Sequence, residues 1–386
     1  MYSKINLSKL IIIFYFCIFL SILTMSLNYS FLIILNSLLF IFALLYLLIF
    51  IKIDVYFKIF ITLLALINLS ILTSSWDARS IWLFKAKIFF FEGNIFDIFS
   101  HPQFSHPTYP FIGSVFASMF AKSLNIWNEV YPKIGIFFLF VPPLLFLSTI
   151  FIKNYLYALL SLTLFVFGKY FVNGEMDGLV TIYFFTSLIL TYEIIYKKDD
   201  NSFKMIILFL NNIILSLLKF EGTVMIFLFI LIYLFYYTLS KKIELKKLLF
   251  LKISIIPSII WFIYSSHINN VFQLNDSSFS IKSLFFRLEN FESLILIISF
   301  FLSDEKFLLG IIFYIIFFLK SKNKNLFYLA TSIITFYIII LIFVYLSTNF
   351  DLFWHLNSSA NRVIKPITFI FFTIPLYNIY LNKLKL

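Results

Sequence analysis

Asp77 is the acidic residue best placed for chemistry, because it follows directly on a long apolar segment. It stands in the aromatic and basic stretch 76–87, with the sequence WDARSIWLFKAK. A carboxylate there could act as a general base or ligate a metal, while Arg79, Lys85 and Lys87 could hold a phosphate. The structural alternative is that Asp77 caps a helix and that the cations anchor the chain at lipid headgroups.

Histidines and prolines mark a second polar segment, residues 101–110, with the sequence HPQFSHPTYP. Its prolines exclude a continuous helix and predict an extended, ordered loop. His101 and His106 could ligate zinc, although no carboxylate or cysteine stands at a matching spacing. Hydrogen bonding of His106 to a sugar or phosphate, or a purely structural loop, are the alternatives.

Four further ionisable residues stand at junctions between apolar segments. Glu175 and Asp177 occupy a turn flanked by glycines, where they are either solvated turn residues or part of a site. Lys219 and Glu221 stand where two apolar segments meet with almost no connecting loop. Ionisable groups at such depth are costly unless they are paired or face a polar cavity, which favours a functional role.

The last polar group is Asp351, His355 and Arg362, near the C-terminal end of the chain. Their spacing of four and seven residues would allow one helical face to carry all three. Trp354, beside them, is typical of an anchor at a membrane surface.

The composition places all of these residues in a membrane protein. Of the 386 residues, 62% are hydrophobic and 12% are charged, and the mean hydropathy is +1.01. A soluble domain has about 25% charged residues, so this chain cannot cover a water-facing surface. Long apolar runs recur along the sequence, and a helix of about 20 residues crosses the hydrocarbon of a bilayer. They lack the alternating polarity of a membrane barrel, so the predicted fold is all-α and polytopic.

The apolar runs predict about twelve transmembrane helices, at 10–28, 31–51, 57–75, 132–152, 155–172, 179–196, 203–219, 222–239, 248–266, 306–320, 326–347 and 363–382. They divide the chain into three N-terminal spans (1–75), a first outer loop expected to be catalytic (76–131), central spans (132–266), a second outer segment (267–305) and C-terminal spans (306–386) with a short outer loop at 348–362. Residues 109–124 are expected to lie in the outer interface, and residues 291–303 to be interfacial or re-entrant, because crossings there would reverse the loops that follow.

The placement of charge predicts the orientation. The net charge of +12 would suggest nucleic acid in a soluble protein, but here most lysines stand in short loops that the positive-inside rule assigns to the cytoplasm. Both termini are then cytoplasmic, and every arginine and histidine falls on the other face. The expected location is a bacterial inner membrane. The lone Cys17 lies in the first apolar run, so an internal disulfide is excluded.

Taken together and in this order, these residues resemble the GT-C superfamily of membrane glycosyltransferases, which use polyprenyl-phosphate sugar donors. The resemblance is closest to the bacterial branch of aminoarabinose and mannosyl transferases. The matching motifs are Trp76-Asp77, Trp82 with Lys85-Ala86-Lys87, His106-Pro-Thr-Tyr109-Pro, Glu175 with Asp177, Lys219-Phe-Glu221-Gly, and Asp351 to His355 leading to Arg362.

The resemblance implies that Asp77 is the catalytic base or assists it, and that helices at 78–92 and 109–124 roof the active site. It implies that Arg79, Lys85 or Lys219 neutralises the lipid phosphate. The remaining positions expected to contact substrate are His106, Tyr109, Glu175, Asp177, Glu221, His355 and Arg362. The acceptor could be a glycan, a lipid or a protein, and a divalent metal could assist. Two features depart from the family: three spans precede the first long loop, and no large C-terminal soluble domain follows.

Two other functions fit part of this pattern. A polysaccharide polymerase or ligase fed by polyprenyl-linked sugars would favour a larger late outer loop carrying catalytic arginine and histidine. A lipid or solute transporter would favour ionisable groups in the middle of spans and symmetry between the two halves. Here the first outer loop is the longest, and no such symmetry is evident in the sequence.

Overall fold

The structure is a computed structural model that describes residues 2–71, 73, 75–93, 95–100, 106–151, 153–168, 173–196, 202–240, 251–272, 280–321 and 324–383. Within these ranges the regular elements are helices and no strand is formed, which confirms the all-α prediction. The elements that precede the centre of the chain are α1 (Tyr2–Leu27), α2 (Ser30–Ile49), α3 (Val55–Ser70), the π-helix η1 (Ala78–Leu83), α4 (Phe84–Glu92), η2 (Asp97–Ser100), α5 (Ile112–Ser123), α6 (Val130–Phe138), α7 (Val141–Ile150) and α8 (Lys153–Phe167).

The later elements are α9 (Asp177–Tyr196), α10 (Ser202–Leu218), α11 (Phe220–Ser240), α13 (Ile256–Phe272), α14 (Ile281–Glu289), α15 (Phe291–Leu302), α16 (Glu305–Lys320), α17 (Asn325–Ser347), α18 (Leu352–Val363) and α19 (Lys365–Lys383).

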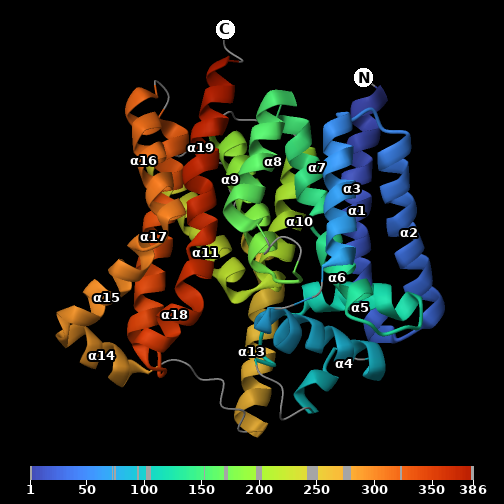
Figure 1. Ribbon diagram of the computed structural model, residues 1–386, viewed down its shortest axis with the longest axis horizontal. Coiled ribbons are helices and arrows are strands. Elements are labelled where there is room, and N and C mark those ends of the chain that lie inside the picture. Colours follow the sequence, from blue (N-terminus) through green and yellow to red (C-terminus); the bar gives the residue numbers. More distant parts are fainter. Residues whose placement is uncertain are drawn as a thin grey trace.

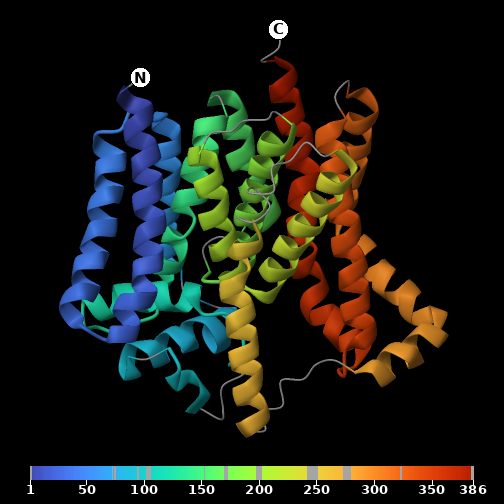
Figure 2. The same cartoon turned by 180° about the vertical axis from the view of Figure 1, so that it is seen from behind.

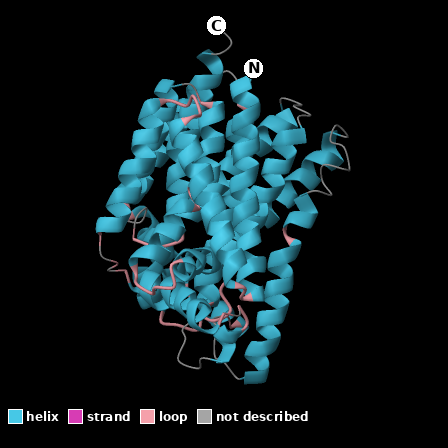
Figure 3. Ribbon diagram, turned by 90° about the vertical axis from the view of Figure 1, so that its right-hand side faces the viewer, coloured by secondary structure: helices cyan, strands magenta, loops and turns pink. Residues whose placement is uncertain are grey.

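The long helices run side by side, and both termini lie at the upper end of the bundle (Figure 1). Helices α1 to α3 form one side, α16, α17 and α19 the other, and α8 to α11 fill the middle, as the reverse view also shows (Figure 2). The shorter helices α4, α5, α14, α15 and α18 gather at the lower end. Most of the described loop segments lie there too (Figure 3). The short helices and most of the described loops are therefore concentrated at the end opposite the termini.

Seven of the described helices are long and apolar enough to cross a membrane, and several shorter apolar helices accompany them. Their exposed surfaces are rich in large apolar side chains, such as Phe42, Leu63, Phe235 and Leu309. Water would not favour this surface but hydrocarbon would, so the chain is embedded in a membrane. The count of twelve spans stays a prediction.

Three predicted spans end differently in the structure. The span predicted at 57–75 ends at Ser70, and the described residues 71, 73 and 75 are not helical. The span predicted at 132–152 is interrupted between α6 and α7, because Pro142 and Pro143 stand in the first turn of α7 and have no N–H to donate. Together the two helices, Val130–Ile150, are still long and apolar enough to cross a membrane once. Helix α13 continues to Phe272, so His267 lies in a helix rather than in an outer loop.

A buried polar network fixes the centre of the bundle. Tyr15 in α1 donates a hydrogen bond to Asn211 Oδ1 in α10, 2.8 Å away. Asn211 Nδ2 in turn donates to Ser187 Oγ in α9 at 2.8 Å, and Ser187 donates to Asn212. Side-chain hydrogen bonds of this kind hold helices together in hydrocarbon, where water cannot compete. They keep α9 in register with its neighbours, so the start of α9, at Asp177, has a fixed position.

Candidate active site

Asp77 and Arg362 form an ion pair across 285 positions of sequence. Arg362 Nη1 donates to Asp77 Oδ2, and Arg362 Nη2 donates to the carbonyl oxygen of Ser358 in its own helix at 3.1 Å. Asp77 stands directly before η1, yet its side chain makes no capping hydrogen bond there. The structural alternative of a helix cap is therefore wrong for Asp77.

A buried ion group lies next to this pair. Lys219 Nζ is 2.9 Å from Asp177 Oδ1 and 2.9 Å from Glu221 Oε1. Burial alone would lower the pKa of Lys219, but the two carboxylates outweigh it and raise the pKa well above its ordinary value. Lys219 is therefore a permanent cation shared by two acids.

The turn that carries Lys219 depends on a glycine. Helix α10 ends at Leu218 and α11 begins at Phe220, so the chain reverses within one residue. A Cβ added to Gly222 would lie 2.0 Å from the carbonyl oxygen of Leu215. Only glycine allows this close approach of the two helices, which directs Lys219 and Glu221 to the same place.

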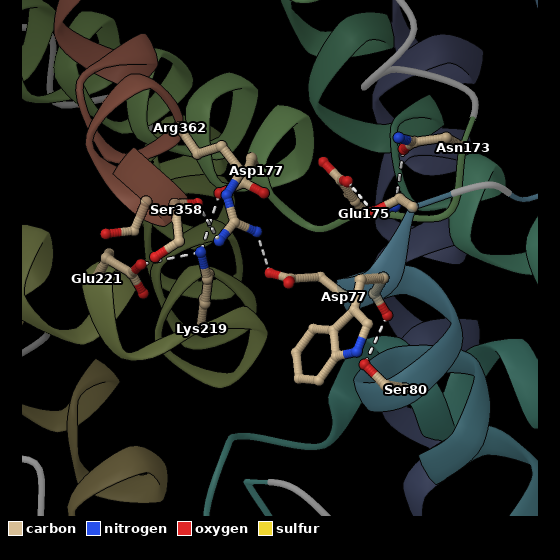
Figure 4. A network of polar contacts seen from close by, with 12 residues as sticks. Asp77, Ser80, Asn173, Glu175, Asp177, Lys219, Glu221, Ser358 and Arg362 are labelled. Carbon is tan, nitrogen blue, oxygen red and sulfur yellow. Dashed lines mark hydrogen bonds and ion pairs between the residues drawn. The ribbon is translucent and has the colours of Figure 1, made fainter. Parts of the chain in front are cut away.

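The two groups are parts of one cluster. Figure 4 shows the Arg362 guanidinium between Asp77 and Asp177, with Lys219 below it, between Asp177 and Glu221. Arg362 interacts electrostatically with Asp177 as well as with Asp77. The structure thus brings together five of the residues that the sequence analysis selected, from both halves of the chain.

Lys365 is a further member that the sequence analysis did not include. It is the first residue of α19, is buried, and interacts electrostatically with Asp177 and Glu175. A lysine at the start of a predicted span, three residues after Arg362, was the available signal, because ionisable residues within membrane helices are rare and usually functional.

Glu175 lies beside the cluster in an unusual environment. Glu175 is 4% exposed; Ser75 donates to Oε1, while Oε2 is buried and has no hydrogen-bond partner among the described residues. Figure 4 places it on the far side of Asp77 from Lys219. Burial, and next the negative charge of Asp177, raise the pKa of Glu175 above its ordinary value. The neutral carboxyl form therefore persists to higher pH here than in an exposed glutamate.

Glu175→Gln is expected to change how stability depends on pH. An acid whose pKa is raised on folding destabilises the folded state as pH rises from its ordinary pKa, here 4.5, toward its raised value. Wild type should therefore lose stability over that range relative to Glu175→Gln, and the two should converge at lower pH. Thermal unfolding of the purified proteins between pH 4 and 9 measures this difference. Parallel curves at every pH would show that folding does not raise the pKa of Glu175.

Lys85 is not a member of the cluster. It is fully buried and donates to the carbonyl oxygens of Tyr109, at 2.5 Å, and of Pro107, at 3.4 Å. Tyr109 stacks on His106 at 4.8 Å and meets Phe220 edge-on at 5.5 Å. These contacts attach the segment 106–110 to α4 and to the start of α11. Lys85 thus fixes this segment, in place of the phosphate contact expected from the sequence.

Lys85→Met is expected to destabilise the protein by about 1–3 kcal/mol, because carbonyl oxygens would lose a buried donor. Lys87→Met is the matched control, since Lys87 stands on the same helix and is exposed. Thermal unfolding in detergent compares the two. Equal unfolding temperatures for both variants would contradict a structural role for Lys85.

Two other predicted site residues lie elsewhere. Arg79 is exposed and pairs with Glu129, Nε to Oε2, at 3.5 Å. His355 packs edge-on against Tyr345 at 5.0 Å, and its Nδ1 is buried with no hydrogen-bond partner in the described part of the chain. His355 therefore faces α17, whereas Arg362 on the same helix reaches Asp77.

The described residues do not form a metal site at the histidine segment 101–110. His101 lies outside the described residues. Within the described ranges, no three His, Cys, Asp or Glu side chains gather as a ligand set for a metal ion. His106 instead uses its ring to stack on Tyr109.

The cluster can perform two chemical tasks in one place. Arg362, Lys219 and Lys365 supply positive charge that could hold a phosphate, and Asp77 supplies a carboxylate that could accept a proton. Comparison of the chain with protein-family models, with curated proteins and with solved structures gives no match. The geometry of this cluster is therefore the ground on which a function can be argued.

Proposed function

We propose that this protein is a membrane glycosyltransferase that moves a sugar from a polyprenyl-phosphate donor to an acceptor on the outer face of a bacterial inner membrane. The observation that supports it best is the pairing of Asp77 with Arg362 beside the buried Lys219. Asp77 is the candidate base, and Arg362 and Lys219 are the two candidate phosphate ligands. The acceptor is a glycan, a lipid or a protein.

The position of the cluster supports a reaction on a lipid-linked substrate. Its residues stand at helix ends and in turns, at the start of η1, of α9 and of α11 and at the end of α18. The termini lie at the opposite end of the bundle (Figure 1). A transporter would place such groups along the middle of its spans. A polyprenyl phosphate carries its phosphate at the membrane surface, where we expect a site at these helix ends to lie.

The reaction assigns a role to each group. An oxygen of the acceptor attacks the anomeric carbon of the donor sugar as the bond from that carbon to the phosphate oxygen breaks. Asp77 accepts the proton of the acceptor hydroxyl, and the polyprenyl phosphate leaves with the bonding electron pair. Arg362 and Lys219 stabilise the negative charge that builds up on the departing phosphate.

Asp77→Asn is expected to lower sugar transfer by at least about 100-fold, because a carboxamide cannot accept the proton. Purified protein in lipid is offered radiolabelled polyprenyl-phosphate sugars with a crude envelope acceptor, and labelled product is counted. Asp97→Asn, the same change in the same outer segment, is the matched control and should keep wild-type activity.

Each outcome of this assay has a definite meaning. Equal transfer by wild type and Asp77→Asn would keep the enzyme class but move the base, with Glu175 the next acid to test. Formation of a long polymer in place of single transfer would favour a polymerase. Absence of turnover by wild type, with acceptor fractions shown to be competent by a known transferase, would overturn the proposed function.

A further inference from the structure

The two ion groups of the cluster differ in how easily a ligand can reach them. The Lys219 side chain is 8% exposed and is held by two carboxylates at 2.9 Å each. The Arg362 and Asp77 side chains are 21% and 17% exposed, and Asp77 is the only carboxylate in direct contact with Arg362 among the ion pairs of the described residues. An incoming anion therefore meets Arg362 before it meets Lys219.

The two Nη atoms of Arg362 donate to two different acceptors, whereas a phosphate could accept from two nitrogens at once. Nη1 donates a hydrogen bond to Asp77, and Nη2 donates one to the carbonyl oxygen of Ser358. A guanidinium binds a phosphate best with two parallel N–H donors, one from each of two nitrogens. A phosphate that binds through Nη1, on the side of Arg362 that faces Asp77, would take the donor that Asp77 now uses, and the carboxylate would have to give it up.

We propose that Asp77 and the phosphate of a lipid-linked ligand compete for Arg362, so that binding of the phosphate releases the Asp77 carboxylate. This inference rests on the proposed function for the identity of the ligand. Without ligand, the Asp77 carboxylate is held in the ion pair with Arg362. With ligand, Arg362 holds the phosphate and Asp77 is free to act as the base. The donor therefore has to bind before the acceptor can be activated.

The segment that carries Asp77 has a local means of moving. The six residues that follow it, Ala78–Leu83, form a π-helix, a rare conformation with one more residue per turn than an α-helix. Return of this turn to α-helical geometry would rotate and shift the residue before it. Trp82, at the other end of the turn, is fully buried and would stay in place.

Binding of polyprenyl phosphate, without a sugar, tests the competition separately from transfer. The lipid is titrated into purified protein in nanodiscs, and the dissociation constant is measured for wild type, Asp77→Asn, Arg362→Gln and the double variant. Asp77→Asn is expected to bind about tenfold more tightly than wild type, because the competitor for Arg362 has been removed. Glu129→Gln, which removes an exposed negative charge elsewhere, should bind as wild type does.

The double variant decides whether Arg362 carries the effect. In the Arg362→Gln background, Asp77→Asn should give no further gain, since there is no guanidinium to release. If Arg362→Gln does not yield folded protein, Arg362→Lys replaces it and the gain should shrink. Polyprenol and inorganic phosphate, each titrated alone, separate the contribution of the chain from that of the phosphate.

The proposal fails if Asp77→Asn binds polyprenyl phosphate no more tightly than wild type, or if the full gain persists without Arg362. These results are independent of the transfer assay. Tighter binding by Asp77→Asn, with no transfer by wild type from any donor, would support the phosphate site and contradict the transferase. Transfer by wild type, with equal binding of polyprenyl phosphate by wild type and Asp77→Asn, would support the transferase and contradict the competition for Arg362.

Discussion

Arg362→Gln is expected to reduce sugar transfer by about 10²–10³-fold. Arg362 is the cation that contacts Asp77 and that lies beside Asp177, and under the proposed function it also binds the departing phosphate. Loss of one preorganised donor to a developing negative charge typically has a cost of this size. Initial rates at saturating donor measure it.

Two further variants test the reason for that loss. Arg79→Gln removes an arginine whose ion pair with Glu129 is exposed, and it should keep its rate within about twofold of wild type. Arg362→Lys keeps the charge but not the paired donors, so it should recover part of the activity. Equal rates for Arg362→Gln and Arg79→Gln would place the phosphate site elsewhere.

The largest expected effect on stability belongs to Lys219→Met. This change leaves the buried Asp177 and the partly buried Glu221 without the ammonium that both contact at 2.9 Å. Removing one partner of a buried ion group costs about 3–5 kcal/mol, because the remaining charges stay desolvated. Thermal unfolding and the yield of monodisperse protein in detergent report the loss, with Lys282→Met as the exposed control.

Neutralising the whole group separates stability from activity. The triple variant Lys219→Met, Asp177→Asn, Glu221→Gln buries no unpaired charge, so it should regain most of the stability that the single variant loses. It should remain inactive, because a phosphate ligand is missing. If the triple variant is as unstable as Lys219→Met, packing of the lysine stem rather than its charge explains the defect.

The general architecture was accessible from the sequence because hydrophobic composition alone decides it. Apolar runs of helical length can be satisfied only by helices in hydrocarbon, and the described helices agree with that expectation. The exact helix ends were less accessible. Pro142 and Pro143 divide one predicted span, and α3 ends before Asp77, because local hydrogen bonding rather than hydropathy determines where a helix ends.

The membership of the cluster was only partly accessible. Residue type and depth singled out Asp77, Lys219 and Arg362, which the structure brings together. Roles that depend on burial could not be predicted from the sequence. The sequence suggests that Lys85 is a surface cation, but in the structure it is buried and donates to Tyr109. Lys365 was missed for the opposite reason, because it stands in an otherwise apolar span.

The cluster also sets an order for biogenesis. A chain made from its N-terminus presents Asp77, then the acids around Asp177, long before Arg362 is synthesised. Until then Lys219 is the one cation of the described cluster available to balance them, and the acids repel one another. Helices α18 and α19, which are synthesised last among these elements, therefore supply the remaining positive charges, Arg362 and Lys365. A chain released before they are inserted would carry an unbalanced, inactive centre, which quality-control proteases could distinguish from the finished protein.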